Sequence, residues 1–157
     1  RGRINEVDVA ALKDLRRRLD ATFKTNLARK GKFTASNVRG NDPQFSAAKA
    51  KDDSRQTYWA TDDGVTDSSL TVEFPKATTF DVVRLREFLP LGQRVEAFAL
   101  DSWDGNAWKE FATGTSVGNC RLVRLAEPVA ATKVRLRILK ADVCPAISEL
   151  SFYKESK

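Results

Sequence analysis

Carboxylates are the residues of this sequence that could support catalysis. The 157 residues contain no histidine, which excludes histidine-activated nucleophiles, histidine metal sites and histidine acid–base chemistry within the chain. Asp101 and Glu110 could be proposed as a hydrolytic pair, because glycosidases place two carboxylates across the scissile bond. Both residues flank a predicted hairpin and are expected to face solvent. We therefore predict that this chain has no catalytic residue of its own.

Charge and cysteine content indicate little about partners. The net charge of +6 attracts polyanions in general, but the basic side chains are dispersed, and the cluster Arg16-Arg17-Arg18 is typical of a solvated helix face. We expect no nucleic-acid partner. We also expect no membrane span, since no apolar run approaches the roughly 20 residues that a spanning helix needs. Cys120 and Cys144 are compatible with one disulfide or with two buried thiols.

Strands must position most of the polar residues. Two runs of alternating apolar and polar residues flank Asp104-Gly105, and an Asp-Gly pair between such runs predicts a tight hairpin because glycine reaches a positive φ. Seven or eight short strands are expected, near residues 33–35, 70–74, 80–88, 94–103, 108–115, 121–125, 133–139 and 147–153. This pattern predicts an antiparallel β-sandwich.

One long amphipathic helix is predicted before the strands. Asn5, with Asp8 three residues later, is a plausible start, and leucines and phenylalanines then recur every three or four residues, at Leu12, Leu15, Leu19, Phe23 and Leu27. The helix should end before Gly31, after about 20 residues and about 30 Å. A small sandwich has little room for this apolar stripe, so its packing partner is expected outside the chain. Residues 31–54 are expected to form a linker into the sandwich.

Several short motifs occur in a defined order along the chain. They are Thr57-Tyr58-Trp59-Ala60, Leu91-Gly92-Gln93-Arg94-Val95, Asp104-Gly105 with Trp108, Gly114-Thr115-Ser116-Val117-Gly118, Val134-Arg135-Leu136 and Cys144-Pro145-Ala146-Ile147-Ser148-Glu149. In this order and spacing they resemble a discoidin, or coagulation factor 5/8 type C, module, which is a jelly-roll relative of the galactose-binding carbohydrate modules. More narrowly, the combination resembles the C-terminal region of α-L-fucosidases of the retaining glycoside hydrolase type.

The resemblance implies a division of the chain and a parent activity. Residues 1–30 would be the last helix of a missing catalytic (β/α) barrel plus a linker, and residues 31–157 the discoidin-like module. The parent would hydrolyse terminal α-L-fucosyl residues, with its catalytic carboxylates upstream, and would be extracellular, periplasmic or lysosomal. The start at Arg1-Gly2-Arg3 without a methionine fits a piece of a longer protein. The alternative is an independent glycan-binding or adhesion module with no attached enzyme.

The resemblance also implies where a fucose- or galactose-containing glycan would bind. Such modules need planar polar groups on loops at one end of the sandwich, and the sequence offers Arg39 and Asn41 in one loop and Gln93 and Arg94 in another. Gln93 and Arg94 could equally brace the module against the barrel. Trp103, at a strand end, is the better exposed aromatic candidate, whereas two other tryptophans, Trp59 and Trp108, are expected in the core.

A structural calcium ion is the cofactor that the resemblance implies. The positions that match its ligands in related modules are Asp52, Ser54, Thr57 and Glu149. Calcium takes about six to eight oxygen ligands from carboxylates, hydroxyls and carbonyls, which such a loop can supply. Ser54 and Asp53 depart from the usual pattern. The alternative is that Asp52 and Asp53 cap a turn while Glu149 pairs with a nearby arginine.

Overall fold

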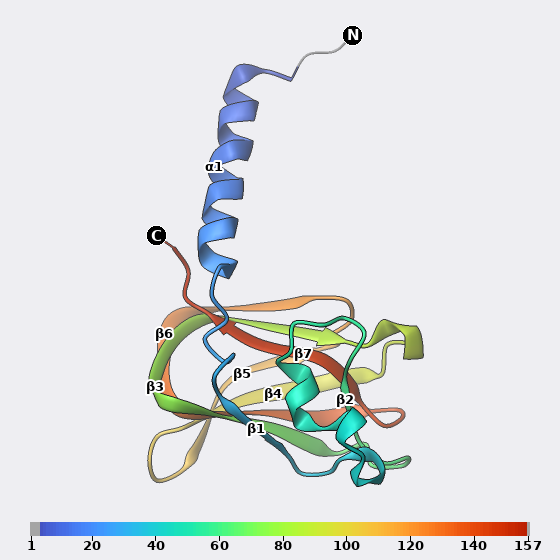
Figure 1. Ribbon diagram of the computed structural model, residues 1–157. Coiled ribbons are helices and arrows are strands. Elements are labelled where there is room, and N and C mark those ends of the chain that lie inside the picture. The colour runs from blue at the N-terminus through green and yellow to red at the C-terminus, as the bar shows by residue number, and fades with distance from the viewer. Residues whose placement is uncertain (1–3, 157) are drawn as a thin grey trace.

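The computed structural model describes residues 4–156, in which one helix precedes seven strands (Figure 1). Helix α1 spans Glu6–Phe23. The strands are β1 (Lys32–Ala35), β2 (Trp59–Ala60), β3 (Ser68–Glu87), β4 (Val95–Trp103), β5 (Trp108–Thr115), β6 (Arg121–Ala141) and β7 (Ala146–Tyr153). All pairings are antiparallel, in the order β2-β7-β3-β6-β4-β5, with β1 added to β3. The predicted mainly-β class with one N-terminal helix is confirmed.

Two long bent strands turn this sheet into two layers. The first half of β3 pairs with β1 and its second half pairs with β7, while β6 follows β3 along both halves. The register shifts between Glu73 and Thr78, where Pro75 interrupts the ladder. The predicted strands 70–74 and 80–88 are therefore halves of one strand, as are 121–125 and 133–139. The prediction separated them because the residues at each bend look like a loop in the sequence.

The core lies between the two layers of the sandwich. Trp59 was predicted to lie in the core, and this prediction is confirmed. Its largest fully buried side chains include Trp59, Phe80, Phe98 and Phe152. The indole nitrogen of Trp59 donates to the carbonyl of Asn37 at 2.9 Å, so its one polar atom is satisfied inside the core.

Helix α1 begins as predicted but ends earlier. The side chain of Asn5 accepts a hydrogen bond from the amide of Val7 at 3.0 Å, which caps the first turn. The last helical residue is Phe23, and the predicted end before Gly31 is wrong. Beyond the helix, the amide of Leu27 donates to the carbonyl of Phe152 at 2.8 Å, and the Leu27 side chain packs against the core. The segment around Leu27 therefore pairs with β7 and does not form the last helical turns that were predicted.

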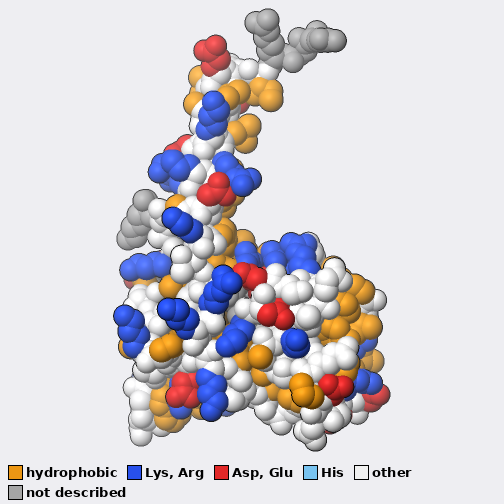
Figure 2. Space-filling model, viewed as in Figure 1, with side chains coloured by type: hydrophobic (Ala, Val, Ile, Leu, Met, Phe, Trp, Pro, Cys, Tyr) orange, Lys and Arg blue, Asp and Glu red, His pale blue; other side chains and the backbone are white. Residues whose placement is uncertain are grey.

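The rest of α1 stands away from the sandwich (Figure 1). Leu12, Leu15 and Leu19 are 56%, 52% and 44% exposed, and hydrophobic side chains line one edge of the helix in Figure 2. The base of α1 is attached to the sandwich, where the Phe23 ring meets Tyr153 edge to face, with centroids 4.9 Å apart. No helix within residues 4–156 is long and apolar enough to cross a membrane.

The predicted linker 31–54 belongs to the sandwich instead. It contains β1 and three short 3-10 helices, Arg39–Asn41, Pro43–Phe45 and Ala47–Ala50. Ala47 and Ala50 are buried in the core. The polar composition of this segment resembles that of a linker, but its small alanines pack under the sheet.

Candidate functional site

Two of the predicted sugar contacts converge at one end of the sandwich. Arg39 comes from the first 3-10 helix and Arg94 from the residue before β4. The Nη1 atoms of Arg39 and Arg94 lie 3.8 Å and 3.0 Å from the sulfur of Cys144, which precedes β7. The two arginines line a pocket of about 250 Å³ together with Tyr58, Ala60, Asp63, Leu91 and Cys144.

An ion pair holds the Arg39 side of the pocket. Arg39 donates through Nη1 and Nη2 to the two carboxylate oxygens of Asp63, at 2.6 Å and 3.0 Å. These hydrogen bonds and the positive charge lower the pKa of Asp63, which stays ionised. The loop is tied down again where Asp62 accepts from the amide of Gly40 at 2.7 Å. Asp63 is largely exposed, so the ion pair alone would hold Arg39 weakly. The second contact of the loop, through Asp62, helps to fix Arg39 in position.

On the other side of the pocket, the backbone at Arg94 is held by a buried carboxylate, that of Glu87, which was not predicted from the sequence. Glu87 is 5% exposed, and its Oε1 accepts from the amides of Arg94 and Val95, each at 2.8 Å. Its Oε2 accepts from the amide of Gly118 at 2.7 Å. A signal existed in the sequence, because Glu87 continues the inward series of Val83 and Leu85 where an apolar residue is expected.

Arg94 keeps donor groups for a ligand. Its Nε donates to the carbonyl of Leu91 at 3.2 Å and its Nη1 to the carbonyl of Cys144 at 2.8 Å. Within residues 4–156, its Nη2 donates to no protein atom. The backbone contacts hold the guanidinium still, and the remaining nitrogen is free to bind a polar group in the pocket.

One aromatic side chain, Tyr58, lines the pocket beside the two arginines. Tyr58 stacks on Phe88 with centroids 4.2 Å apart and an interplanar angle of 15°. Phe45 lies against the same tyrosine, 5.4 Å away. Since Tyr58 is held from two sides, it offers the pocket a rigid aromatic edge and a hydroxyl group.

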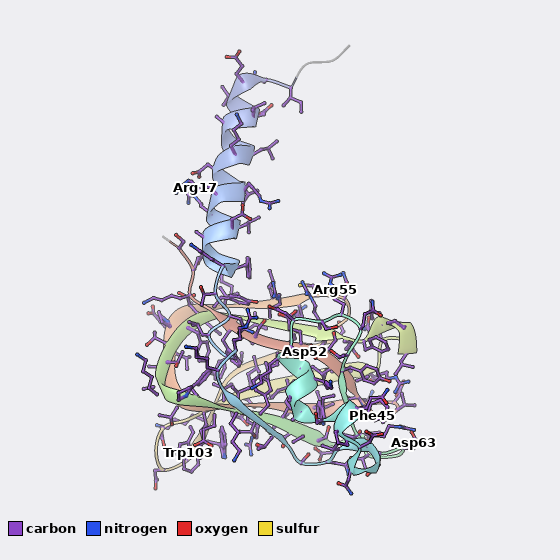
Figure 3. All side chains as sticks on the ribbon, viewed as in Figure 1. Arg17, Phe45, Asp52, Arg55, Asp63 and Trp103 are labelled. Atoms are coloured by element: carbon purple, nitrogen blue, oxygen red, sulfur yellow. The ribbon has the colours of Figure 1, made fainter. Side chains whose placement is uncertain are left out.

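The remaining predicted sugar contacts lie elsewhere. Asn41 and Gln93 are exposed and do not line the pocket. Trp103 is half-buried at the end of β4, and Figure 3 shows it on the opposite side of the sandwich from Asp63. Trp108 was expected in the core but is also only half-buried, because it lies across the hairpin from Trp103, where the two rings meet 5.4 Å apart.

The proposed acid pair forms an ion-pair cluster instead. Asp101 is 2% exposed, so the expectation that it faces solvent is wrong. Its carboxylate accepts from Arg135 at 2.9 Å and from Arg137 at 2.7 Å, and Arg137 also binds the exposed Glu110 at 2.8 Å. Burial would raise the pKa of Asp101, but the hydrogen bonds from Arg137 and Arg135 outweigh burial and lower it. An acid held ionised by two arginines is poorly placed to donate a proton.

The predicted calcium ligands form two separate sets of contacts. Asp52 accepts from the hydroxyl of Thr57 at 2.7 Å and from the amide of Ser54 at 3.0 Å. The Glu149 carboxylate pairs with Arg84 at 2.5 Å and with Arg86 at 2.8 Å. Within residues 4–156, no group of three or more acidic or cysteine side chains is arranged to hold a metal ion. In this arrangement both oxygens of Glu149 are engaged by guanidinium groups, and the calcium ion stays a prediction.

Neither alternative for the cysteines is correct. Cys120 is exposed and Cys144 is buried, and both are free thiols. Cys144 instead forms the floor of the pocket, with Asp63 Oδ1 3.7 Å from its sulfur.

Comparisons with known proteins identify the family and the fold of the chain. The model of the F5/8 type C domain family matches residues 32–150. The chain is 31% identical to α-L-fucosidase 1 of Arabidopsis thaliana over 98% of its own length and 31% of that relative's length. It superposes on a GH29 fucosidase of Ruminococcus gnavus, solved with fucose, with a TM-score of 0.91, 29% identity and coverage of 99% of this chain and 32% of the other. A family 32 carbohydrate-binding module of C. perfringens, solved with galactose, shares the fold at 18% identity, with a TM-score of 0.72 over 83% of this chain and 98% of its own.

Proposed function

The chain belongs to the F5/8 type C domain family, and on that premise we propose that it is the non-catalytic, carbohydrate-binding module of a longer glycoside hydrolase. The observation that carries the proposal is the convergence of Arg39 and Arg94 on one pocket from loops that are far apart in the sequence. Two fixed guanidinium groups beside the ring of Tyr58 are suited to a sugar, whose hydroxyls pair with planar donors and whose ring packs on apolar surface.

Each side of the pocket contributes a different part of sugar recognition. Arg94 supplies the free Nη2 donor, and the exposed carboxylate of Asp63 supplies acceptors for hydroxyl protons. Tyr58 and Leu91 supply the apolar contact for the C–H face of the ring. The ligand we propose is a terminal fucose or galactose residue, the sugars bound in the solved fucosidase and carbohydrate-binding module.

The parent protein that we propose is a retaining α-L-fucosidase. The chain spans about a third of the length of the fucosidases it matches, which leaves room for a catalytic domain. That domain would provide the two carboxylates that hydrolysis of an α-L-fucosyl bond with retention requires. We propose an extracellular, periplasmic or lysosomal location, where such glycans occur.

The exposed face of α1 is the proposed docking surface for the catalytic barrel of the same parent chain. Leu12, Leu15 and Leu19 lie on one face of a helix that is attached to the sandwich at its base, and all three are more than 40% exposed. A stripe of this kind normally packs on another element. The occupant we propose is the missing catalytic domain, since the matched relatives are about three times longer than this chain.

Glycan binding tests the pocket directly. We expect the chain to bind a fucose- or galactose-terminated oligosaccharide in titration calorimetry, and Arg94→Ala to weaken that binding about tenfold or more, because a charged hydrogen-bond donor contributes about 1.5–3 kcal/mol. Arg121→Ala, which removes an exposed arginine on β6, is the matched control and should bind normally. The assignment of the pocket would be refuted if the chain bound neither fucose- nor galactose-terminated oligosaccharides. It would also be refuted if the wild-type and Arg94→Ala chains bound them with equal affinity.

The helix stripe gives a second test in solution. Without its partner, the chain should self-associate as its concentration rises, because exposed leucines on one face favour contact. We expect Leu15→Glu combined with Leu19→Glu to restore a monomer in analytical ultracentrifugation. Arg16→Gln with Lys13→Gln, elsewhere on the same helix, lowers the net charge by the same two units and should leave the association in place. A wild-type chain that stays monomeric at all concentrations would argue against a docking face.

A further inference from the structure

Arg84 joins two segments that the sequence analysis assigned to a calcium site. Its Nε donates to Glu149 Oε1 at 2.8 Å, which places its guanidinium on β7. Its Nη2 lies 3.8 Å from Asp53 Oδ1, in the loop of residues 52–57. The Arg84 side chain is 16% exposed and that of Glu149 is 4% exposed. A partly buried cation therefore lies between the acidic loop and the C-terminal strand.

Glu149 already uses most of its acceptor capacity on donors of the protein. Oε1 accepts from Arg84 and from the hydroxyl of Ser151, at 2.5 Å for the hydroxyl. Oε2 is 2.8 Å from Nη1 of Arg86. Two guanidinium groups already balance this buried charge, and burial of a carboxylate is tolerated only when such partners are present.

The loop side shows the matching arrangement. Asp53 has a φ of 63°, a left-handed conformation that only a few non-glycine residues adopt, and its carboxylate is the one in the loop that pairs with Arg84. Asp52, by contrast, is engaged within the loop by Thr57 and Ser54. Hydrogen bonds between its own residues therefore hold the loop in shape, and the ion pair of Asp53 with Arg84 links it to the rest of the sandwich.

The same guanidinium also contacts the base of α1. Its central carbon lies 4.9 Å from the ring centroid of Tyr153 and 5.5 Å from that of Phe23. Phe23 is the last residue of α1, and Tyr153 is the last residue of β7. A planar, weakly hydrated guanidinium can stack on aromatic rings while it binds a carboxylate, which neither a lysine nor a calcium ion can do equally well.

We propose that Arg84 takes the place of the structural calcium in this chain. Its guanidinium is the cation that joins the loop of residues 52–57 to β7, and it also fixes the base of α1 on the sandwich. The module is therefore held together by a side chain and does not depend on a divalent ion.

The wild-type chain alone provides the first test. Its melting temperature should be the same, within about 1 °C, in excess calcium chloride and in excess EDTA, because a ligand stabilises a protein only if it binds the folded state. A rise of several degrees in calcium, reversed by EDTA, would overturn the proposal. This measurement needs no variant and no glycan, so its outcome is independent of the sugar-binding proposal.

Variants of Arg84 provide the second test. Arg84→Met keeps the apolar stem but removes the cation, and we expect a melting temperature about 5 °C lower, in calcium and in EDTA alike. Arg84→Lys should recover only part of the loss, since an ammonium cannot pair and stack at once. Arg124→Met on β6 is the matched control, because it breaks an exposed pair with Glu155, which follows β7, and it should shift the temperature by about 2 °C or less. An Arg84→Met chain as stable as the wild type would overturn the proposal.

Discussion

Replacing Glu87 with alanine is expected to lower the free energy of unfolding by about 3–5 kcal/mol. The substitution removes the acceptor of three backbone amides, those of Arg94, Val95 and Gly118, and the amide of Val95 is buried. An unsatisfied buried donor costs about 1–3 kcal/mol, and water can reach only some of these groups. The measurement is chemical denaturation followed by tryptophan fluorescence.

Two further variants isolate the role of the Glu87 carboxylate. Glu87→Gln keeps one side-chain oxygen and should cost only about 1–2 kcal/mol. Glu73→Ala, on the same strand but exposed, should change stability by less than about 0.5 kcal/mol. Because Glu87 holds the amide of Arg94, Glu87→Gln should also weaken glycan binding, although Glu87 does not line the pocket. A stable Glu87→Ala chain with unchanged affinity would show that the loop does not need this anchor.

Trp59→Ala should cost about 4 kcal/mol of unfolding free energy. Trp59 is fully buried, and truncation of a buried aromatic residue typically costs about 3–5 kcal/mol through lost contacts and a cavity. The change also leaves the carbonyl of Asn37 without its donor, at the start of the loop that carries Arg39. We expect a large drop in the denaturation midpoint, with the slope of the transition unchanged.

Two other tryptophan variants separate packing from the hydrogen bond. Trp59→Phe keeps most of the apolar volume and should cost about 2 kcal/mol. Trp103→Ala is the matched control, because Trp103 is half-buried at a hairpin end, and it should cost about 1 kcal/mol. Equal losses for Trp59→Ala and Trp103→Ala would contradict the place of Trp59 at the centre of the core.

Local patterns were sufficient to predict most strands and the start of the helix. The alternation in residues 108–115 matches β5 to the residue, since a half-buried strand has a period of two. The Asn5 cap was predictable because it depends on atoms two residues away. The end of α1 was not, because it depends on the pairing of Leu27 with Phe152, which lies at the other end of the chain.

The sequence analysis named two residues of the candidate site correctly but did not predict how the site is arranged in space. Arg39 and Arg94 were named from the sequence, but Trp103 was assigned to the same site and lies on the other side of the sandwich. The burial of Asp101 was not foreseen, because its face of the strand is decided by the neighbouring strands. The burial of Glu87 was overlooked, although its position continues the inward series of Val83 and Leu85. The groups that neutralise a buried charged residue lie far away in the sequence, so the residues next to it do not reveal them.

Four properties were predictable without the structure: the fold class, most strand positions, the family resemblance and the lack of histidine chemistry. These properties depend on composition and on spacings of a few residues, which local sterics and hydrophobic burial convert directly into structure. The meeting of Arg39 and Arg94 at Cys144 became visible only in the folded chain, because Cys144 lies 105 and 50 residues away from them in the sequence. Contacts of this kind depend on how β3 and β6 bend to close the sandwich, and that bend results from long-range pairing that no local window of the sequence contains.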